Sequence, residues 1–125
     1  MKFLHLLALF FSFSLFAVPV MAEEPPFRHA VFFQFKDTAS DDQIDLIIQE
    51  FIALKDKIDT IVDLEWGTSE SVEGLNDGFT HAFFVTFEDK AGLEVYLPHP
   101  DHKAFVEILK PSLEKVFVFD YTAGK

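Results

Sequence analysis

The sequence predicts a single α+β domain in which helices cover one face of a four-stranded antiparallel sheet. Alternating apolar residues, rich in Phe and β-branched types, indicate strands at residues 27–36 and 79–87. Apolar residues at helical spacing indicate an amphipathic helix at residues 41–57. With the weaker segments included, the order is β-α-β-β-α-(α)-β, which is the split βαβ pattern of ferredoxin-like folds.

The first predicted strand, residues 27–36, has two faces. One face carries His29, Val31, Phe33 and Phe35, and the other carries Ala30, Phe32, Gln34 and Lys36. The helix that follows begins with a capping box, Ser40 to Gln43, and places acidic residues in its first turn, where the helix dipole favours them.

The remaining segments are shorter, and prolines and glycines separate them. Asn76-Asp77-Gly78 is a turn signal, and Pro100 suits the first position of a helix. The predicted segments are a half-exposed strand at 62–66, a loop at 68–77, a buried strand at 79–87, a short helix from Glu88 through Tyr96 that Pro98 stops, a second helix from His99-Pro100 that Pro111 bends or restarts, and a last strand at 116–122.

The first 22 residues have the pattern of a secretory signal peptide. Lys2 gives a basic start, an apolar run covers residues 3–18, and Val20-Met21-Ala22 offers a cleavage site. We expect residues 1–22 to be removed, residues 23–125 to form the domain, and the protein to be exported, either periplasmic or secreted. The run also approaches the roughly 20 residues that span a bilayer, so an uncleaved anchor is the alternative. After cleavage we expect no stable membrane association.

The mature chain is strongly acidic and contains no cysteine. Without the leader, nine Lys and Arg stand against 21 Asp and Glu, a net charge of −12. Such a surface repels phosphate backbones and anionic membranes, so we expect no nucleic-acid partner. Without disulfides, burial of apolar side chains has to stabilise the fold.

Both faces of the predicted sheet are apolar. Phe32 and Phe84 are opposite in phase to Phe33 and Phe83, and the last strand carries further aromatic residues, Phe117, Phe119 and Tyr121. A soluble monomer rarely exposes so large an apolar patch. The pattern therefore predicts a homodimer that packs through the open sheet face, opposite the helices.

Four polar aromatic residues are candidates for a site. Tyr96 and His102 flank the Pro98 break, where an imidazole base and a phenol donor can face a common cavity. The alternative is that Tyr96 is a core residue and His102 caps or pads the helix. His29 and His81 begin two strands expected to be adjacent, so their rings are expected to converge, with partly buried structural histidines as the alternative.

Metal and cofactor chemistry have little support in the sequence. His99, Asp101 and His102 have a possible ligand spacing, but Pro100 constrains the turn and nothing nearby completes a set. The chain has no Gly-rich phosphate loop, serine elbow or cysteine nucleophile. We therefore expect neither a metal nor a cofactor.

Several stretches resemble the stress-responsive α/β-barrel (Dabb) family over about residues 26–123. They are residues 28–36, 78–82, 96–102 and 118–121, and the most specific is the His-Pro-x-His element with its preceding Tyr96. The resemblance implies a ferredoxin-like domain that dimerises sheet to sheet into a barrel. It also implies that His102 is a base, that Tyr96 holds a substrate carbonyl, and that His29 and His81 lie in the site.

The resemblance also locates a pocket between sheet and helices. Phe51 and Val106 stand where a characterised member has a tyrosine and a glycine, so a smaller or differently shaped pocket is expected. The first functional hypothesis is that this pocket binds a small apolar molecule. The second is a cofactor-free lyase or cyclase that uses His102 and Tyr96, and the third is a structural dimer with a filled barrel. The substrate-binding residues are predicted to be His29, His81, Phe33, Phe51, Phe83 and Phe105.

Overall fold

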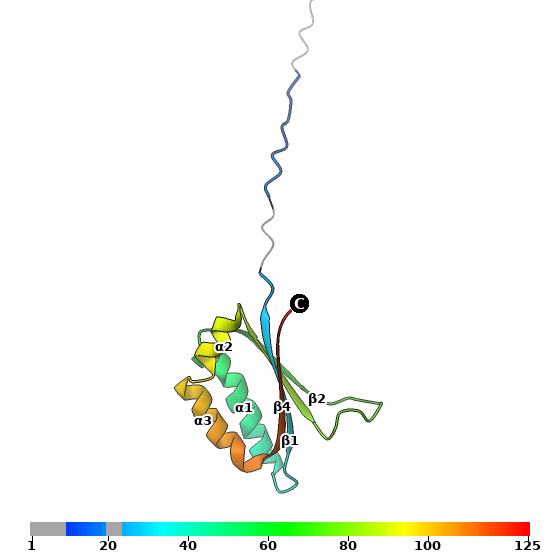
Figure 1. Cartoon of the computed structure of the whole chain (residues 1–125), viewed down its shortest axis with the longest axis vertical. Helices are drawn as coiled ribbons and strands as arrows, with labels where there is room; N and C mark the ends of the chain where they lie inside the picture. The colour runs from blue at the N-terminus through cyan, green and yellow to red at the C-terminus, as the bar shows by residue number, and fades with distance from the viewer. Residues whose placement is uncertain (1–9, 20–23) are drawn as a thin grey trace, which may run out of the picture.

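The computed structural model describes residues 10–19 and 24–125 (Figure 1). The elements are β1 (Phe27–Phe35), α1 (Asp41–Lys57), β2 (Ile61–Thr68), β3 (His81–Phe87), α2 (Lys90–Tyr96), α3 (Pro100–Leu109), the 3-10 turn η1 (Lys110–Ser112) and β4 (Leu113–Thr122). The predicted signal peptide falls partly outside the described residues, and residues 10–19 form neither helix nor strand. No helix among the described residues is long and apolar enough to cross a membrane.

The four strands form one antiparallel sheet in the order β2-β3-β1-β4. Helices α1, α2 and α3 all lie on one side of it (Figure 1). The central strands are β1 and β3, and they pair from Phe27 opposite Phe87 to Phe33 opposite His81. This arrangement confirms the predicted ferredoxin-like fold.

Helix α1 has the bounds that its sequence signals predict. The Ser40 hydroxyl accepts the backbone N–H of Gln43 at 3.2 Å, and the Gln43 side-chain oxygen accepts the N–H of Ser40 at 2.9 Å. This capping box satisfies two donors that the helix itself leaves unpaired. The helix buries Ile47, Ile48, Phe51 and Leu54 against the sheet side of the molecule.

Phenyl rings fill the layer between sheet and helices. Phe51 from α1 stacks on Phe83 from β3 with ring centres 4.4 Å apart and planes 3° from parallel. The ring centres of Phe33 and Phe83 are 5.3 Å apart, and those of Phe51 and Phe105, on α3, are 4.6 Å apart. All four are buried. Burial of side chains this large stabilises the fold by about 1.5–3 kcal/mol each, so this cluster is central to stability.

The open sheet face is apolar and aromatic, as its alternation predicts. Phe32 contacts Phe84 at 6.0 Å and Phe117 at 5.8 Å between ring centres. Phe119, also on β4, is 56% exposed. No helix or strand of residues 24–125 covers this side of the sheet (Figure 1), and only Phe79 of the β2–β3 loop packs on it, with its ring centre 6.5 Å from that of Phe32. An uncovered patch of this kind is typical of an interaction surface.

Several element boundaries differ from the sequence prediction, for local reasons. Helix α2 begins at Lys90 rather than Glu88, because the Asp89 carboxylate caps it by accepting the N–H of Gly92 at 3.3 Å. Strand β3 begins at His81 rather than Phe79, because the Phe79 N–H bonds the Asn76 carbonyl within the preceding turn. Strand β4 starts early, at Leu113.

Candidate functional site

Tyr96 is the centre of the candidate site. It is the last residue of α2 and is only 1% exposed. Its ring packs edge-on against Phe87 of β3, with centres 5.4 Å apart. The helix ends here because Pro98, two residues later, has no backbone N–H with which to continue the helical hydrogen bonds. Burial raises the pKa of the Tyr96 phenol, so the hydroxyl keeps its proton at neutral pH.

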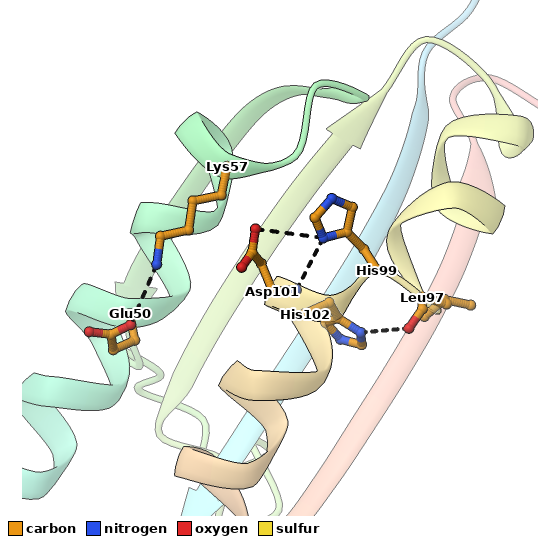
Figure 2. Close-up of polar contacts among 6 residues, drawn as sticks. All are labelled: Glu50, Lys57, Leu97, His99, Asp101 and His102. Carbon is orange, nitrogen blue, oxygen red and sulfur yellow. Dashed lines mark hydrogen bonds and ion pairs between the residues drawn. The ribbon is translucent and has the colours of Figure 1, made fainter.

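His102 lies against Tyr96 from the first turn of α3. The two ring centres are 4.3 Å apart. The His102 Nδ1 donates to the Leu97 carbonyl at 2.9 Å, so the ring reaches from α3 towards the end of α2 (Figure 2). Because a carbonyl oxygen only accepts, Nδ1 carries the proton and Nε2 is left as the basic nitrogen. The arrangement gives a proton acceptor directly beside a phenol.

The turn between the two helices is built by His99 and Pro100. His99 caps α3, since its Nδ1 accepts the backbone N–H of Asp101 at 3.1 Å (Figure 2). Pro100 occupies the first turn, where its missing N–H costs no hydrogen bond. The predicted helix start at His99-Pro100 is confirmed, and this cap fixes where His102 enters the site.

His29 contacts Tyr96 from the sheet side and is held by Asp120. The His29 and Tyr96 ring centres are 5.7 Å apart, at an edge-on angle of 63°. The His29 Nδ1 lies 2.5 Å from the Asp120 carboxylate, directly across the β1–β4 ladder. Asp120 is absent from the sequence prediction. Strand alternation and the β1–β4 pairing identify it, because together they place its carboxylate opposite His29.

Burial makes the protonated form of His102 less favourable than that of an ordinary histidine. Desolvation lowers the pKa of His102, the Leu97 carbonyl opposes this, and the charges of His29 and His99 lower the pKa further. His102 is therefore neutral at pH 7. A neutral imidazole beside a protonated phenol is the pair that general acid–base chemistry requires.

His81 does not join this cluster, which corrects the expected convergence with His29. In the antiparallel register His81 faces Phe33, whereas His29 faces Val85. Four residues of strand, about 13 Å, therefore separate the two histidines along the sheet. The His81 ring instead packs against Phe35, with ring centres 5.0 Å apart, and its Nδ1 is hydrogen-bonded to the Thr80 hydroxyl at 2.8 Å. The prediction failed because the starts of adjacent antiparallel strands lie at opposite ends.

The predicted substrate-binding rings are parts of the core. Phe33, Phe51, Phe83 and Phe105 contact one another, so they fill the space in which a pocket was expected. Val106 packs against the same cluster. Hollows at described residues lie elsewhere. One of about 580 Å³ lies beside Phe32 and Phe117 on the open face, one of about 770 Å³ lies beside Phe27 and Thr86, and one of about 370 Å³ lies beside His102. Ligand binding by the four rings stays a prediction.

The His99, Asp101 and His102 stretch does not gather its side chains around one point. The His99 Nδ1 lies 3.8 Å from the Asp101 carboxylate, while the His102 ring is directed at Leu97 (Figure 2). Within residues 10–19 and 24–125, no group of three or more His, Cys, Asp or Glu side chains has the geometry to hold a metal ion. The site thus consists of Tyr96, His102, His29 and Asp120.

The fold and this site define a class of ferredoxin-like domains with a histidine–tyrosine cluster at one end of the helix-covered face. The model of the stress responsive A/B barrel domain, Dabb, matches residues 27–123. The chain belongs to this family. The resemblance in its sequence motifs is thereby confirmed.

Known relatives include a stress-response barrel protein and a cyclase. The chain is 38% identical over 96 residues to stress-response A/B barrel domain-containing protein HS1 of Arabidopsis thaliana, covering 77% of this chain and 88% of that one. It is 30% identical over 98 residues to olivetolic acid cyclase of Cannabis sativa, covering 78% and 97%.

Solved structures agree with the fold. Hydroxynitrile lyase from Passiflora edulis superposes with a TM-score of 0.77 at 32% identity, over 82% of this chain and 96% of the other. A protein from Jannaschia described as dimeric and ferredoxin-like superposes with a TM-score of 0.70 at 22% identity, over 78% and 99%. The second likeness concerns the fold alone.

Proposed function

We propose that the protein is a homodimeric lyase that uses its own acid and base groups to break or form a bond next to a carbonyl carbon. The observation that carries this proposal is the contact between Tyr96 and His102, whose rings are 4.3 Å apart. His102 supplies a free Nε2, and Tyr96 supplies a protonated hydroxyl in a nearly dry environment. Two relatives, a hydroxynitrile lyase and a cyclase, support the same reaction class.

The proposed step balances without an added group. His102 takes the proton from the hydroxyl of a β-hydroxy carbonyl compound or a cyanohydrin. The carbon–carbon bond breaks, the new carbonyl forms, and the electron pair leaves as an enolate or cyanide. The Tyr96 hydroxyl donates to the oxygen on which charge develops. The protonated His102 then returns its proton to the leaving carbanion.

The dimer is part of the proposal because the open face needs a cover. Phe32, Phe84, Phe117 and Phe119 form an aromatic surface on the side away from the helices. A second copy packed sheet to sheet covers both surfaces at once, as an isologous contact with twofold symmetry. The site lies on the other side of each sheet, so each protomer carries a complete Tyr96–His102 pair.

A structural dimer is the second candidate, and the filled core favours it. Phe51, Phe83 and Phe105 occupy the space between sheet and helices, which leaves less support for an apolar ligand bound there. In this alternative Tyr96 is a core residue and His102 pads the helix junction.

A turnover assay separates the two candidates. The purified domain, residues 23–125, is incubated with mandelonitrile and with a set of small β-hydroxy ketones and β-hydroxy acids, and carbonyl release is followed. The lyase proposal expects cleavage of at least one substrate above the rate without protein. It also expects that cleavage is lost in His102→Gln while the fold, followed by circular dichroism, is kept. Equal cleavage rates for the wild-type protein and His102→Gln would favour the structural dimer.

A further inference from the structure

The aromatic open face also carries an arginine and a glutamate. Strand register places Arg28 opposite Thr86 and Glu65 opposite Phe84. Phe84 contacts Phe32 on the open face, and Thr86 lies two residues further along β3, so both charged side chains are on the side away from the helices. Neither of them forms a salt bridge within residues 10–19 and 24–125.

The other charged residues at paired positions of this face already have partners. Lys115 of β4 lies 3.0 Å from the Asp77 carboxylate, and Asp63 of β2 lies 3.3 Å from the Lys55 ammonium. Their charges are therefore offset within one protomer. The open face is left with one positive and one negative charge, on Arg28 and Glu65.

Arg28 is oriented for a further contact. The side chain is half-buried, and its Nη1 donates to the Thr86 hydroxyl at 2.7 Å. A guanidinium has five N–H groups in a rigid fork, and this bond uses one of them. The bond also holds the fork over β3, which lowers the entropy lost when a carboxylate binds.

The positions of the two charges suit a twofold contact between open faces. Arg28 and Glu65 lie about 10 Å apart across the sheet, with β3 between them, and about 7 Å apart along the strands. A twofold axis between two facing sheets exchanges these positions when it crosses the line that joins them at its midpoint and at a right angle. That axis passes close to the middle of the sheet, so the same alignment covers the aromatic rings.

We propose that the open face selects a second copy of this chain through an ion pair between Arg28 of each protomer and the partner subunit's Glu65. The pair rests on the proposed homodimer and determines how the two sheets are aligned. Burial of either charge under a second sheet without its partner would be strongly unfavourable. An apolar surface that lacks the matching charges is therefore rejected.

Charge reversal tests the pair. In Arg28→Glu and in Glu65→Arg, each twofold contact brings two like charges together, so the dimer dissociation constant should rise by about 100-fold or more. A mixture of the two variants should form heterodimers, because both contacts are then complementary. Sedimentation velocity measures each variant, and native mass spectrometry identifies the heterodimer. The double variant Arg28→Glu/Glu65→Arg should dimerise again by itself.

Asp63→Arg is the matched control for the mixing experiment. It makes the same change of charge two positions away on β2, so its mixture with Arg28→Glu should gain no heterodimer. If circular dichroism shows that a charge-reversal variant has not folded, Arg28→Met and Glu65→Gln replace it in a double-mutant cycle. The effects of these two substitutions on dimerisation should then be clearly less than additive.

A monomeric wild-type chain would overturn both the homodimer and the ion pair. A wild-type dimer that Arg28→Glu does not weaken, variants that do not associate on mixing, or additive effects in the cycle would overturn the ion pair alone. Equal gains with Asp63→Arg would also overturn it, because the attraction would then be unspecific. Turnover decides none of these outcomes, so the lyase chemistry stands or falls separately.

Discussion

Tyr96 lies between two imidazoles, and each of them has its Nδ1 fixed by a different acceptor. Asp120 holds His29 and the Leu97 carbonyl holds His102. Acceptors at both Nδ1 atoms require protons there, so both rings present an unprotonated Nε2 when neutral. A core residue needs no such arrangement around its ring. The polar groups around this phenol are therefore the strongest residue-scale argument for chemistry.

Replacement of Tyr96 by Phe removes the hydroxyl and keeps the ring contacts. If the hydroxyl donates to the developing oxyanion, turnover should fall by about 10²-fold or more. Stability should change little, because the buried ring still packs on Phe87. Steady-state kinetics and thermal unfolding of Tyr96→Phe measure both quantities. Full activity in this variant would remove Tyr96 from the mechanism.

Asp120 is expected to matter for stability through His29. Asp120→Ala leaves the buried His29 Nδ1 without its partner, which should lower the free energy of unfolding by about 1–3 kcal/mol. Asp63→Ala is the control, since Asp63 makes only an exposed pair with Lys55 at 3.3 Å and should cost about 1 kcal/mol or less. Urea unfolding compares them, and equal losses would show that the His29 contact adds nothing.

The pH dependence of His102 follows from its environment. Burial lowers the pKa of His102 from its ordinary 6.5, helped by the charges of His29 and His99 and opposed by the Leu97 carbonyl. Only the neutral ring accepts a proton. Activity should therefore rise with pH and reach its plateau at a pH below 6.5. Between the lowered pKa and 6.5 the unfolded chain binds more protons, so stability should also rise with pH in that window. A ring titration by nuclear magnetic resonance with a midpoint at or above 6.5 would contradict both.

At the scale of elements, local sequence signals located the helices better than they located the site. Ser40 and Gln43 determine the start of α1 by neighbouring hydrogen bonds, so the sequence alone predicts it. The relation of His29 to His81 depends on strand register, which local pattern does not contain. Asp120 was missed for the same reason, since its role exists only once β4 pairs with β1. Pocket volume likewise depended on how the rings of Phe51 and Phe83 packed.

The loop between β2 and β3 depends on Gly78. Its φ is +77°, and a Cβ there would meet the Gln34 side chain at 2.9 Å. Gly78→Ala should therefore cost about 1–2 kcal/mol of stability, chiefly from the left-handed backbone. Gly67→Ala in β2 is the matched control, because a Cβ there meets nothing within 4 Å. Urea unfolding of the two variants tests the difference, and equal stabilities would show that the loop relaxes freely.

At the scale of the whole molecule, the sheet separates two tasks. Its helix-covered face carries His29 in contact with Tyr96, and its open face carries Phe32 in contact with Phe117. Alternation along β1 sends neighbouring residues to opposite faces, so one strand serves both the site and the proposed interface. A substitution on the open face should therefore weaken dimerisation more than it disturbs the Tyr96–His102 site.

Phe119→Glu tests this separation. Phe119 is 56% exposed on β4, and a charge there would be buried without a partner in a sheet-to-sheet dimer. The penalty of about 2–5 kcal/mol should raise the dimer dissociation constant by roughly 30-fold or more, which sedimentation velocity over a concentration series measures. Leu46→Glu, at an exposed position of α1 on the helix side, should leave the dimer intact. A wild-type monomer would contradict the proposed dimer, and equal effects of both substitutions would place the interface elsewhere, because only Phe119 lies on the open face.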